Sequence, residues 1–220
     1  MSLDTLEFET APNPTASVIV LHGLGADGND FVPIAEALAL DPVGPVRFVF
    51  PHAPVRPVTI NGGMSMRAWY DIRQADLGRQ EDEGGLRESL LDVEALIARE
   101  RGRGVAASRI VLMGFSQGCA MTLLTGLRHA ERLAGLVGLS GYLPLADKTA
   151  AERSAANQDV PIFMAHGTRD PVVVLPRATA SRDHLQSLGY AVEWHDYAME
   201  HSVCQEEIAD MQDWLQKVLA

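Results

Sequence analysis

Short apolar runs recur along the chain, and most of them end in glycine or proline. They span residues 17–23, 46–54, 109–115, 133–141, 160–167 and 190–197. Runs of this length that are rich in β-branched and aromatic residues are typical of buried parallel strands. Helical spacing of the apolar positions lies between most of them, over 29–40, 86–101, 117–129, 177–188 and 203–218. The alternation predicts an α/β fold, with a mostly parallel central sheet and helices on both faces.

The connection over 52–85 breaks this alternation. It shows no convincing helix or strand over about 34 residues, and a structureless loop of that length is often functional. Because it follows a strand, we expect it to emerge at the carboxyl edge of the sheet. It is unusually apolar for a loop, with Val55, Val58, Ile60, Met64, Met66, Trp69, Tyr70, Ile72 and Leu77.

Length and charge narrow the class of protein. At 220 residues the chain is expected to form one domain, residues 1–220. A net charge of -11 without clustered lysines argues against nucleic acid as a partner. Two cysteines make no disulfide framework. We expect a cytoplasmic protein, since the N-terminus lacks a signal-peptide pattern and no apolar run approaches the about 18 residues of a membrane span.

The sequence GFSQG, residues 114–118, places one serine between two glycines where a predicted strand meets a predicted helix. This pattern in this context is typical of a nucleophile elbow, whose tight turn leaves no room for a Cβ on either side. Such a turn would lift the Ser116 hydroxyl above the sheet. The motif alone also fits a packing turn with a bystander serine.

A serine hydroxyl is a weak nucleophile until a base takes its proton. In this architecture the partners follow in the order serine, acid, histidine, each after a strand. Of the seven histidines, His201 best fits the expected position, in the loop between the last predicted strand and the last predicted helix. Asp170 follows the predicted strand within 160–167. Each could singly be a polar loop residue, but their order and context predict a triad of Ser116, Asp170 and His201.

Acyl transfer also needs fixed N–H donors for the oxyanion. One is expected at Gln117, directly after the nucleophile. The second is expected at Leu24, in the glycine-rich turn HGLGADGND over 22–30. An ordinary turn entering a capped helix would look the same, and both interpretations can hold together.

The chain carries seven sequence motifs whose order resembles that in the carboxylesterase and acyl-protein thioesterase family of α/β-hydrolases, the phospholipase/carboxylesterase group. The resemblance runs from about residue 12 to the C-terminus. It implies the α/β-hydrolase fold without a large lid domain, and the same triad and oxyanion residues. Family members hydrolyse carboxylic esters, some cleave thioesters of acylated proteins or lysophospholipids, and several form homodimers. The motifs are LHGLGADGNDF, FPHAP, RAWYDI, GFSQGCAM, LSGYLP, HGTRDPVV and MEHSVC.

We therefore predict a serine hydrolase that cleaves small acyl esters or acylated substrates through an acyl-enzyme. No metal or organic cofactor is expected, because the sequence carries no H-E-x-x-H, P-loop or dinucleotide fingerprint. A serine peptidase or lipase would use the same triad. A non-catalytic ligand-binding protein of the same fold is a second alternative.

The apolar residues of 52–85 have two possible destinations. One is a satellite core beneath the loop, which the size of Trp69 favours for that residue. The other is an acyl-binding groove beside the nucleophile. In that case Met64, Met66, Trp69 and Leu77, with Ile60, would bind substrate.

Overall fold

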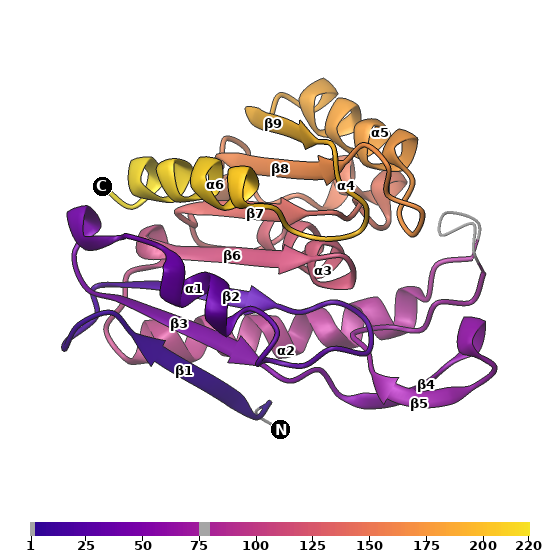
Figure 1. Cartoon of the computed structure of the whole chain (residues 1–220), viewed down its shortest axis with the longest axis horizontal. Coiled ribbons are helices and arrows are strands. Elements are labelled where there is room, and N and C mark those ends of the chain that lie inside the picture. Colours follow the sequence, from indigo (N-terminus) through magenta and orange to yellow (C-terminus); the bar gives the residue numbers. More distant parts are fainter. Residues whose placement is uncertain (1–2, 75–79) are drawn as a thin grey trace.

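The computed structural model describes residues 3–74 and 80–220. A seven-stranded sheet forms its centre, in the order β1-β3-β2-β6-β7-β8-β9 (Figure 1). The strands of this sheet are β1 (Thr5–Glu9), β2 (Ala16–Leu21), β3 (Val46–Pro51), β6 (Ile110–Phe115), β7 (Gly135–Leu139), β8 (Ile162–Gly167) and β9 (Val192–Tyr197). The helices are α1 (Val32–Ala37), α2 (Glu83–Gly102), α3 (Gln117–Gly126), α4 (Ala146–Glu152), α5 (Leu175–Ser187) and α6 (Gln205–Val218).

The sheet is parallel except at one edge, where β1 pairs antiparallel with β3. In the register between β2 and β6, Leu21 lies opposite Gly114. The loop after β2 and the turn after β6 therefore leave the sheet side by side at its carboxyl edge. This architecture confirms the predicted α/β-hydrolase fold, and the described residues form no large lid domain.

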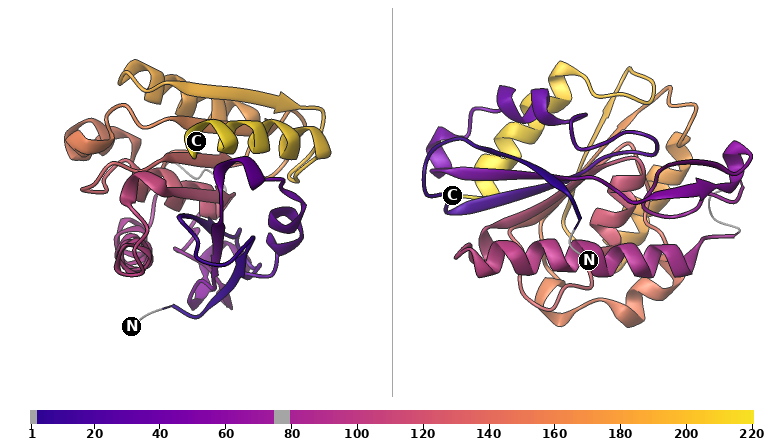
Figure 2. Two further views of the ribbon diagram at one scale, coloured as in Figure 1. Left: turned by 90° about the vertical axis from the view of Figure 1, so that its left-hand side faces the viewer. Right: turned by 90° about the horizontal axis from the view of Figure 1, so that it is seen from below.

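Helices cover both faces of the sheet (Figures 1 and 2). Successive residues of β2 alternate between two buried clusters. Ile19 and Leu21 pack in the cluster that contains apolar residues of α2, α3 and α5. Val18 and Val20 pack in the cluster that contains those of α1 and α6. Because both faces are covered, the central strands have no polar face, and this is why they read as unbroken apolar runs.

The structure adds elements that the pattern did not predict. The 52–85 connection, expected to lack regular structure, contains an antiparallel hairpin of β4 (Val55–Val58) and β5 (Met64–Arg67). Its turn includes Gly62 and Gly63 at φ of 66° and 79°, where a side chain would be strained. The hairpin residues are largely exposed and include Pro57, so no buried-strand pattern marks them. The edge strand β1 and the short helix α4 were also not predicted.

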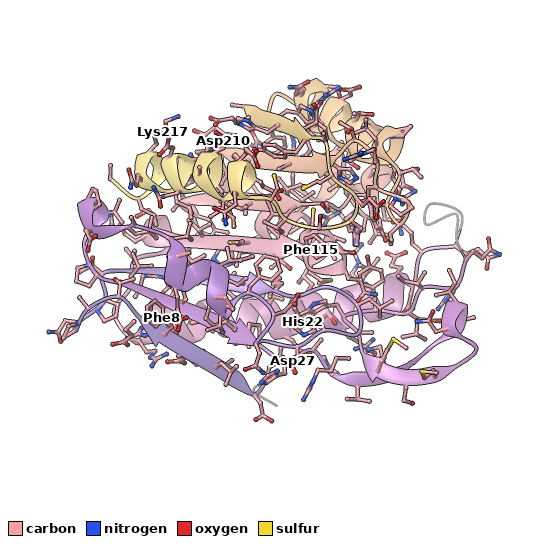
Figure 3. All side chains as sticks on the ribbon, in the orientation of Figure 1. Phe8, His22, Asp27, Phe115, Asp210 and Lys217 are labelled. Carbon is pink, nitrogen blue, oxygen red and sulfur yellow. The ribbon has the colours of Figure 1, made fainter. Side chains whose placement is uncertain are left out.

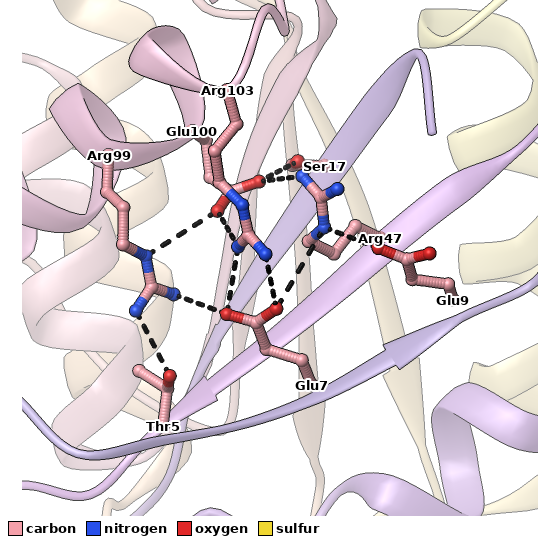
Figure 4. A network of polar contacts seen from close by, with 8 residues as sticks. All are labelled: Thr5, Glu7, Glu9, Ser17, Arg47, Arg99, Glu100 and Arg103. Atoms are coloured by element: carbon pink, nitrogen blue, oxygen red, sulfur yellow. Dashed lines mark hydrogen bonds and ion pairs between the residues drawn. The ribbon is translucent and has the colours of Figure 1, made fainter. Parts of the chain in front are cut away.

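A polar network holds β1 against the sheet at its amino edge (Figure 4). The fully buried carboxylate of Glu100 accepts hydrogen bonds from Ser17 Oγ at 2.7 Å, Arg47 Nη1 at 2.9 Å and Arg103 Nη1 at 2.9 Å. Arg103 and Arg47 also form ion pairs with Glu7 of β1. Burial acts to raise the pKa of Glu100, but these three hydrogen bonds outweigh it and lower the pKa below its usual value. These structural ion pairs thus lie at the amino ends of the strands, whereas the loops described next follow the carboxyl ends.

No helix in the described ranges combines the length and the apolar character needed to span a bilayer.

Candidate active site

Ser116 lies in a strained turn between β6 and α3. Its backbone has φ of 55° and ψ of -114°, a conformation that residues other than glycine rarely adopt. The turn is held by a hydrogen bond from Ser116 N to Leu139 O of β7 at 2.9 Å. The conformation is the sharp strand-to-helix turn predicted for a nucleophile elbow, and such strain persists only where surrounding contacts enforce it.

The two flanking glycines are required by close backbone packing. A Cβ on Gly114 would lie 2.2 Å from backbone atoms of Gly118. A Cβ on Gly118 would lie 1.9 Å from the carbonyl oxygen of Leu21 in β2. Both separations are far inside van der Waals contact. The elbow therefore fits against β2 only because neither glycine has a side chain.

His201 and Asp170 are brought together from two loops at the same edge. Asp170 follows β8, and His201 lies between β9 and α6. Asp170 Oδ2 accepts a hydrogen bond from His201 Nδ1 at 2.6 Å. Asp170 Oδ1 accepts from the backbone N–H groups of Val172 at 2.8 Å and Val173 at 2.9 Å. The carboxylate is thus fully engaged and can hold the imidazole in one tautomer.

The imidazole of His201 also packs beside the nucleophile turn. Its ring centroid lies 4.7 Å from that of Phe115, the residue before Ser116, and Figure 3 shows Phe115 at the end of β6. In the described residues the His201 ring is hydrogen-bonded to Asp170 and not to Ser116 Oγ. In serine hydrolases without substrate, the contact between serine and histidine is often long. Of the three residues predicted from sequence order, Asp170 and His201 are thus in direct contact, and the His201 ring lies beside the residue that precedes Ser116.

His166, which the sequence order excluded from the triad, supports the Asp170 loop. Its Nε2 lies 2.6 Å from Val173 O and 3.4 Å from Asp170 Oδ2. Because a carbonyl oxygen can only accept, Nε2 carries the hydrogen. Burial lowers the pKa of His166, which keeps the ring neutral. The sequence analysis did not predict this contact; the place of His166 at the end of β8, four residues before Asp170, is the feature that could have indicated it.

The glycine-rich turn after β2 faces the nucleophile. A Cβ on Gly23 would lie 3.5 Å from Ser116 Cβ. The neighbouring His22 is buried, and its Nε2 accepts a hydrogen bond from Ala53 N at 3.0 Å. Its Nδ1 therefore carries the hydrogen that is donated to Gly23 O at 2.7 Å, and burial lowers the pKa of His22. This neutral histidine fixes the turn that carries Leu24.

A pocket of about 240 Å³ opens at Ser116. Its walls include Ser116 and both expected oxyanion residues, Leu24 and Gln117. Most of the remaining lining is apolar or aromatic, as is usual for a site that binds an organic ligand. The lining residues are Leu24, Ile60, Asn61, Tyr70, Ile72, Ser116, Gln117, Tyr142, Val172 and Val173.

Most of the residues expected in the acyl groove are not among the described residues that line this pocket. Trp69 is fully buried in the core, where its indole N–H donates to His22 O, and it is not among the described residues that line the pocket. Met64 is 65% exposed on the hairpin, and neither it nor Met66 is among the described residues that line the pocket. Both lie on β5, where the hairpin projects away from the sheet (Figure 1). Leu77 lies outside the described residues.

Ile60, also expected in the groove, does line the pocket. Val172 and Val173 also line it. These two residues follow Asp170 directly, so the loop that carries the acid also shapes the pocket. No pattern in the sequence indicated this second role.

In the described ranges, no group of three or more histidine, cysteine, aspartate or glutamate side chains is placed to hold a metal ion.

Comparison with known proteins gives a consistent match over nearly the whole chain. The sequence model of the family described as Phospholipase/Carboxylesterase matches residues 8–219. Acyl-protein thioesterase 1 of Yarrowia lipolytica is 44% identical over 208 residues, which cover 92% of each chain. The crystal structure of Arabidopsis thaliana SOBER1 superimposes with a TM-score of 0.88 at 29% identity, covering 93% of this chain and 99% of that one. The crystal structure of Zea mays acyl-protein thioesterase 2 gives a TM-score of 0.84 at 29% identity and covers 99% of both chains.

Proposed function

Because this chain belongs to the phospholipase/carboxylesterase family of α/β-hydrolases and is a serine hydrolase of esters and thioesters, we propose that Ser116, His201 and Asp170 form its catalytic triad. The observation that carries this proposal is the 2.6 Å contact from His201 Nδ1 to Asp170, beside a serine held in a strained elbow. An acid and a histidine in this relation are what a serine nucleophile requires.

In the proposed reaction, Ser116 Oγ attacks the carbonyl carbon of the substrate while His201 Nε2 takes the hydroxyl proton. The C–O or C–S bond to the leaving group then breaks, and His201 returns the proton to the departing alkoxide or thiolate. The acyl group remains on Ser116 as an ester. A water molecule, deprotonated by His201, attacks this ester. The bond between the acyl carbon and Ser116 Oγ then breaks, His201 returns the proton to Oγ, and the carboxylic acid leaves. Asp170 stabilises the imidazolium that forms in each half of the cycle.

Two backbone N–H groups are proposed to stabilise the negative oxygen. Gln117 N belongs to the first residue of α3, where unpaired N–H groups point out of the helix. Leu24 N belongs to the turn after β2, which lies against Ser116. Removing one oxyanion donor in enzymes of this kind costs about 10² to 10³ in kcat.

The substrate class is proposed to be an acyl ester or acyl thioester whose chain enters the pocket. The apolar wall formed by Ile60, Ile72 and Val172 supports this assignment. Each methylene that leaves water on binding contributes about 0.8 kcal/mol. Acyl groups of increasing length should therefore bind more tightly until the pocket is filled.

A panel of matched ester, thioester and anilide substrates tests the proposed reaction. Esters and thioesters should be cleaved far faster than the anilide, because an amine leaves only after strong protonation. Ser116→Ala should lower turnover of every active substrate by several powers of ten without lowering the melting temperature. Faster cleavage of the anilide would favour a peptidase, and activity retained by Ser116→Ala would refute the triad.

A further inference from the structure

The segment 67–70 contacts both loops that carry the proposed oxyanion donors. It begins at Arg67, the last residue of β5, and ends at Tyr70, which lines the pocket. Trp69 is fully buried there, although it comes from a long surface connection. Its contacts are polar as well as apolar, and they reach two elements that are far apart in the sequence.

On one side, the segment fixes the peptides that flank Leu24. Gly25 N donates a hydrogen bond to Arg67 O at 2.9 Å. Trp69 Nε1 donates to His22 O at 2.9 Å. The peptide groups before and after the Leu24 N–H are thus both tied to the same four residues.

On the other side, the segment holds the Gln117 side chain. Trp69 N donates to Gln117 Oε1 at 2.9 Å, and Gln117 Nε2 donates to Tyr70 O at 2.8 Å. Gln117 is only 2% exposed, so both ends of its amide are satisfied by this one segment. The residue whose backbone N–H faces the oxyanion is therefore anchored through its own side chain.

The segment is itself fixed to the rest of the fold. Arg67 Nη1 donates to Ala53 O at 2.9 Å, and Ala68 N donates to Pro54 O at 3.0 Å. Ser89 of α2 donates to Trp69 O. Because these contacts reach a strand end and a long helix, the segment can act as a rigid spacer.

We propose that Trp69 and the Gln117 side chain are positioning residues that set the separation of the two oxyanion donors. This inference rests on the proposed function, since it assumes Leu24 N and Gln117 N as donors. Donors help only if they are fixed where the oxyanion will form, and small displacements of a site are costly. The 67–70 segment supplies that fixation to both donors at once, so neither loop can move without the other.

The test uses two variants that remove different contacts. Trp69→Phe removes the indole N–H to His22 O and keeps an aromatic ring. Gln117→Met removes both side-chain bonds and keeps the backbone N–H. We expect kcat on an ester to fall about tenfold for Trp69→Phe and up to about a hundredfold for Gln117→Met, with KM little changed. Binding of a boronic acid, which forms a tetrahedral adduct with serine, should weaken by the same factors as kcat/KM.

Val93→Ala is the matched control. Val93 is fully buried in the same core cluster as Trp69 but lies on α2 and does not line the pocket. It should lower the melting temperature and leave kcat and boronic acid binding unchanged.

The outcomes separate this inference from the triad. If Ser116→Ala is inactive while Trp69→Phe keeps full kcat and full boronic acid affinity, the spacer role is refuted and the triad stands. If Ser116→Ala keeps its activity, the proposed function itself fails. Should Gln117→Met not fold, Trp69→Phe alone decides the question.

Discussion

Asp170→Asn is the substitution whose outcome the site geometry determines most closely. Asp170 Oδ1 accepts two backbone N–H groups, from Val172 and Val173 at 2.8 and 2.9 Å. Asp170 Oδ2 accepts His201 Nδ1 at 2.6 Å. An asparagine offers one oxygen and one NH2 group, so it cannot accept on both sides. In one of the two sets of contacts, the NH2 group must then face another hydrogen-bond donor, and no hydrogen bond can form there.

The two backbone donors decide which way the amide turns. Turning the NH2 group toward Val172 and Val173 would lose two hydrogen bonds, each worth about 1 kcal/mol net. The amide oxygen should therefore stay with the backbone, by roughly 2 kcal/mol. The NH2 group then faces His201 Nδ1, which must lose its hydrogen to accept. His201 Nε2 carries the proton instead and cannot take one from Ser116, a defect that costs about 10⁴ in kcat.

The assay is kcat at neutral pH on one activated ester, for Asp170→Asn and Asp170→Ala, with melting temperatures as the control for folding. The alanine variant imposes no tautomer, so the asparagine variant should be no more active than it. Turnover of Asp170→Asn above about a tenth of wild type would refute the assignment of Asp170 as the residue that orients His201.

Three further predictions follow from the same structure. Gly118→Ala should fail to fold or lose the elbow, because its Cβ would lie 1.9 Å from Leu21 O; a soluble variant with full kcat would contradict this. Ile60→Ala should reduce kcat/KM for an octanoyl ester more than for an acetyl ester, since each methylene that loses its contact costs up to about 0.8 kcal/mol; equal losses would place the acyl chain elsewhere. Burial raises the pKa of Glu207 from 4.5 to about 8, so the unfolded chain releases this proton first and the free energy of unfolding should fall as pH rises between these values. Glu207→Gln should remove that slope and add roughly 3 kcal/mol at pH 7 relative to wild type, as measured by urea unfolding at pH 5, 7 and 8; parallel curves for both proteins would contradict it.

The central strands could be predicted because burial on both faces requires an unbroken run of apolar residues, which is visible in the sequence. Strands such as β2 and β6 are buried along nearly their whole length. The edge strand β1 has no such apolar run, since its Glu7 and Glu9 form ion pairs with arginines distant in the sequence. Pairing of this kind depends on the fold being formed, so a local pattern cannot reveal it.

The site divides in the same way. Ser116, Asp170 and His201 could be proposed together because each follows a recognisable strand in a fixed order, and the structure brings Asp170 and His201 into contact. The lining of the pocket could not, because it depends on the path of each loop. Trp69 illustrates the limit, since its size favoured burial but its indole partner, His22 O, lies 47 residues away. Only the folded structure shows that this buried tryptophan contacts both His22, in the turn that carries Leu24, and Gln117.

The most direct test of the central claim is to locate the covalent adduct formed with a fluorophosphonate. Mass spectrometry of the wild-type protein should show one adduct per chain, on the peptide that contains Ser116. Labelling should be absent from Ser116→Ala and much slower in His201→Ala, because the hydroxyl then lacks its base. An adduct on another residue, or labelling of Ser116→Ala at the wild-type rate, would contradict the assignment of Ser116 as the nucleophile.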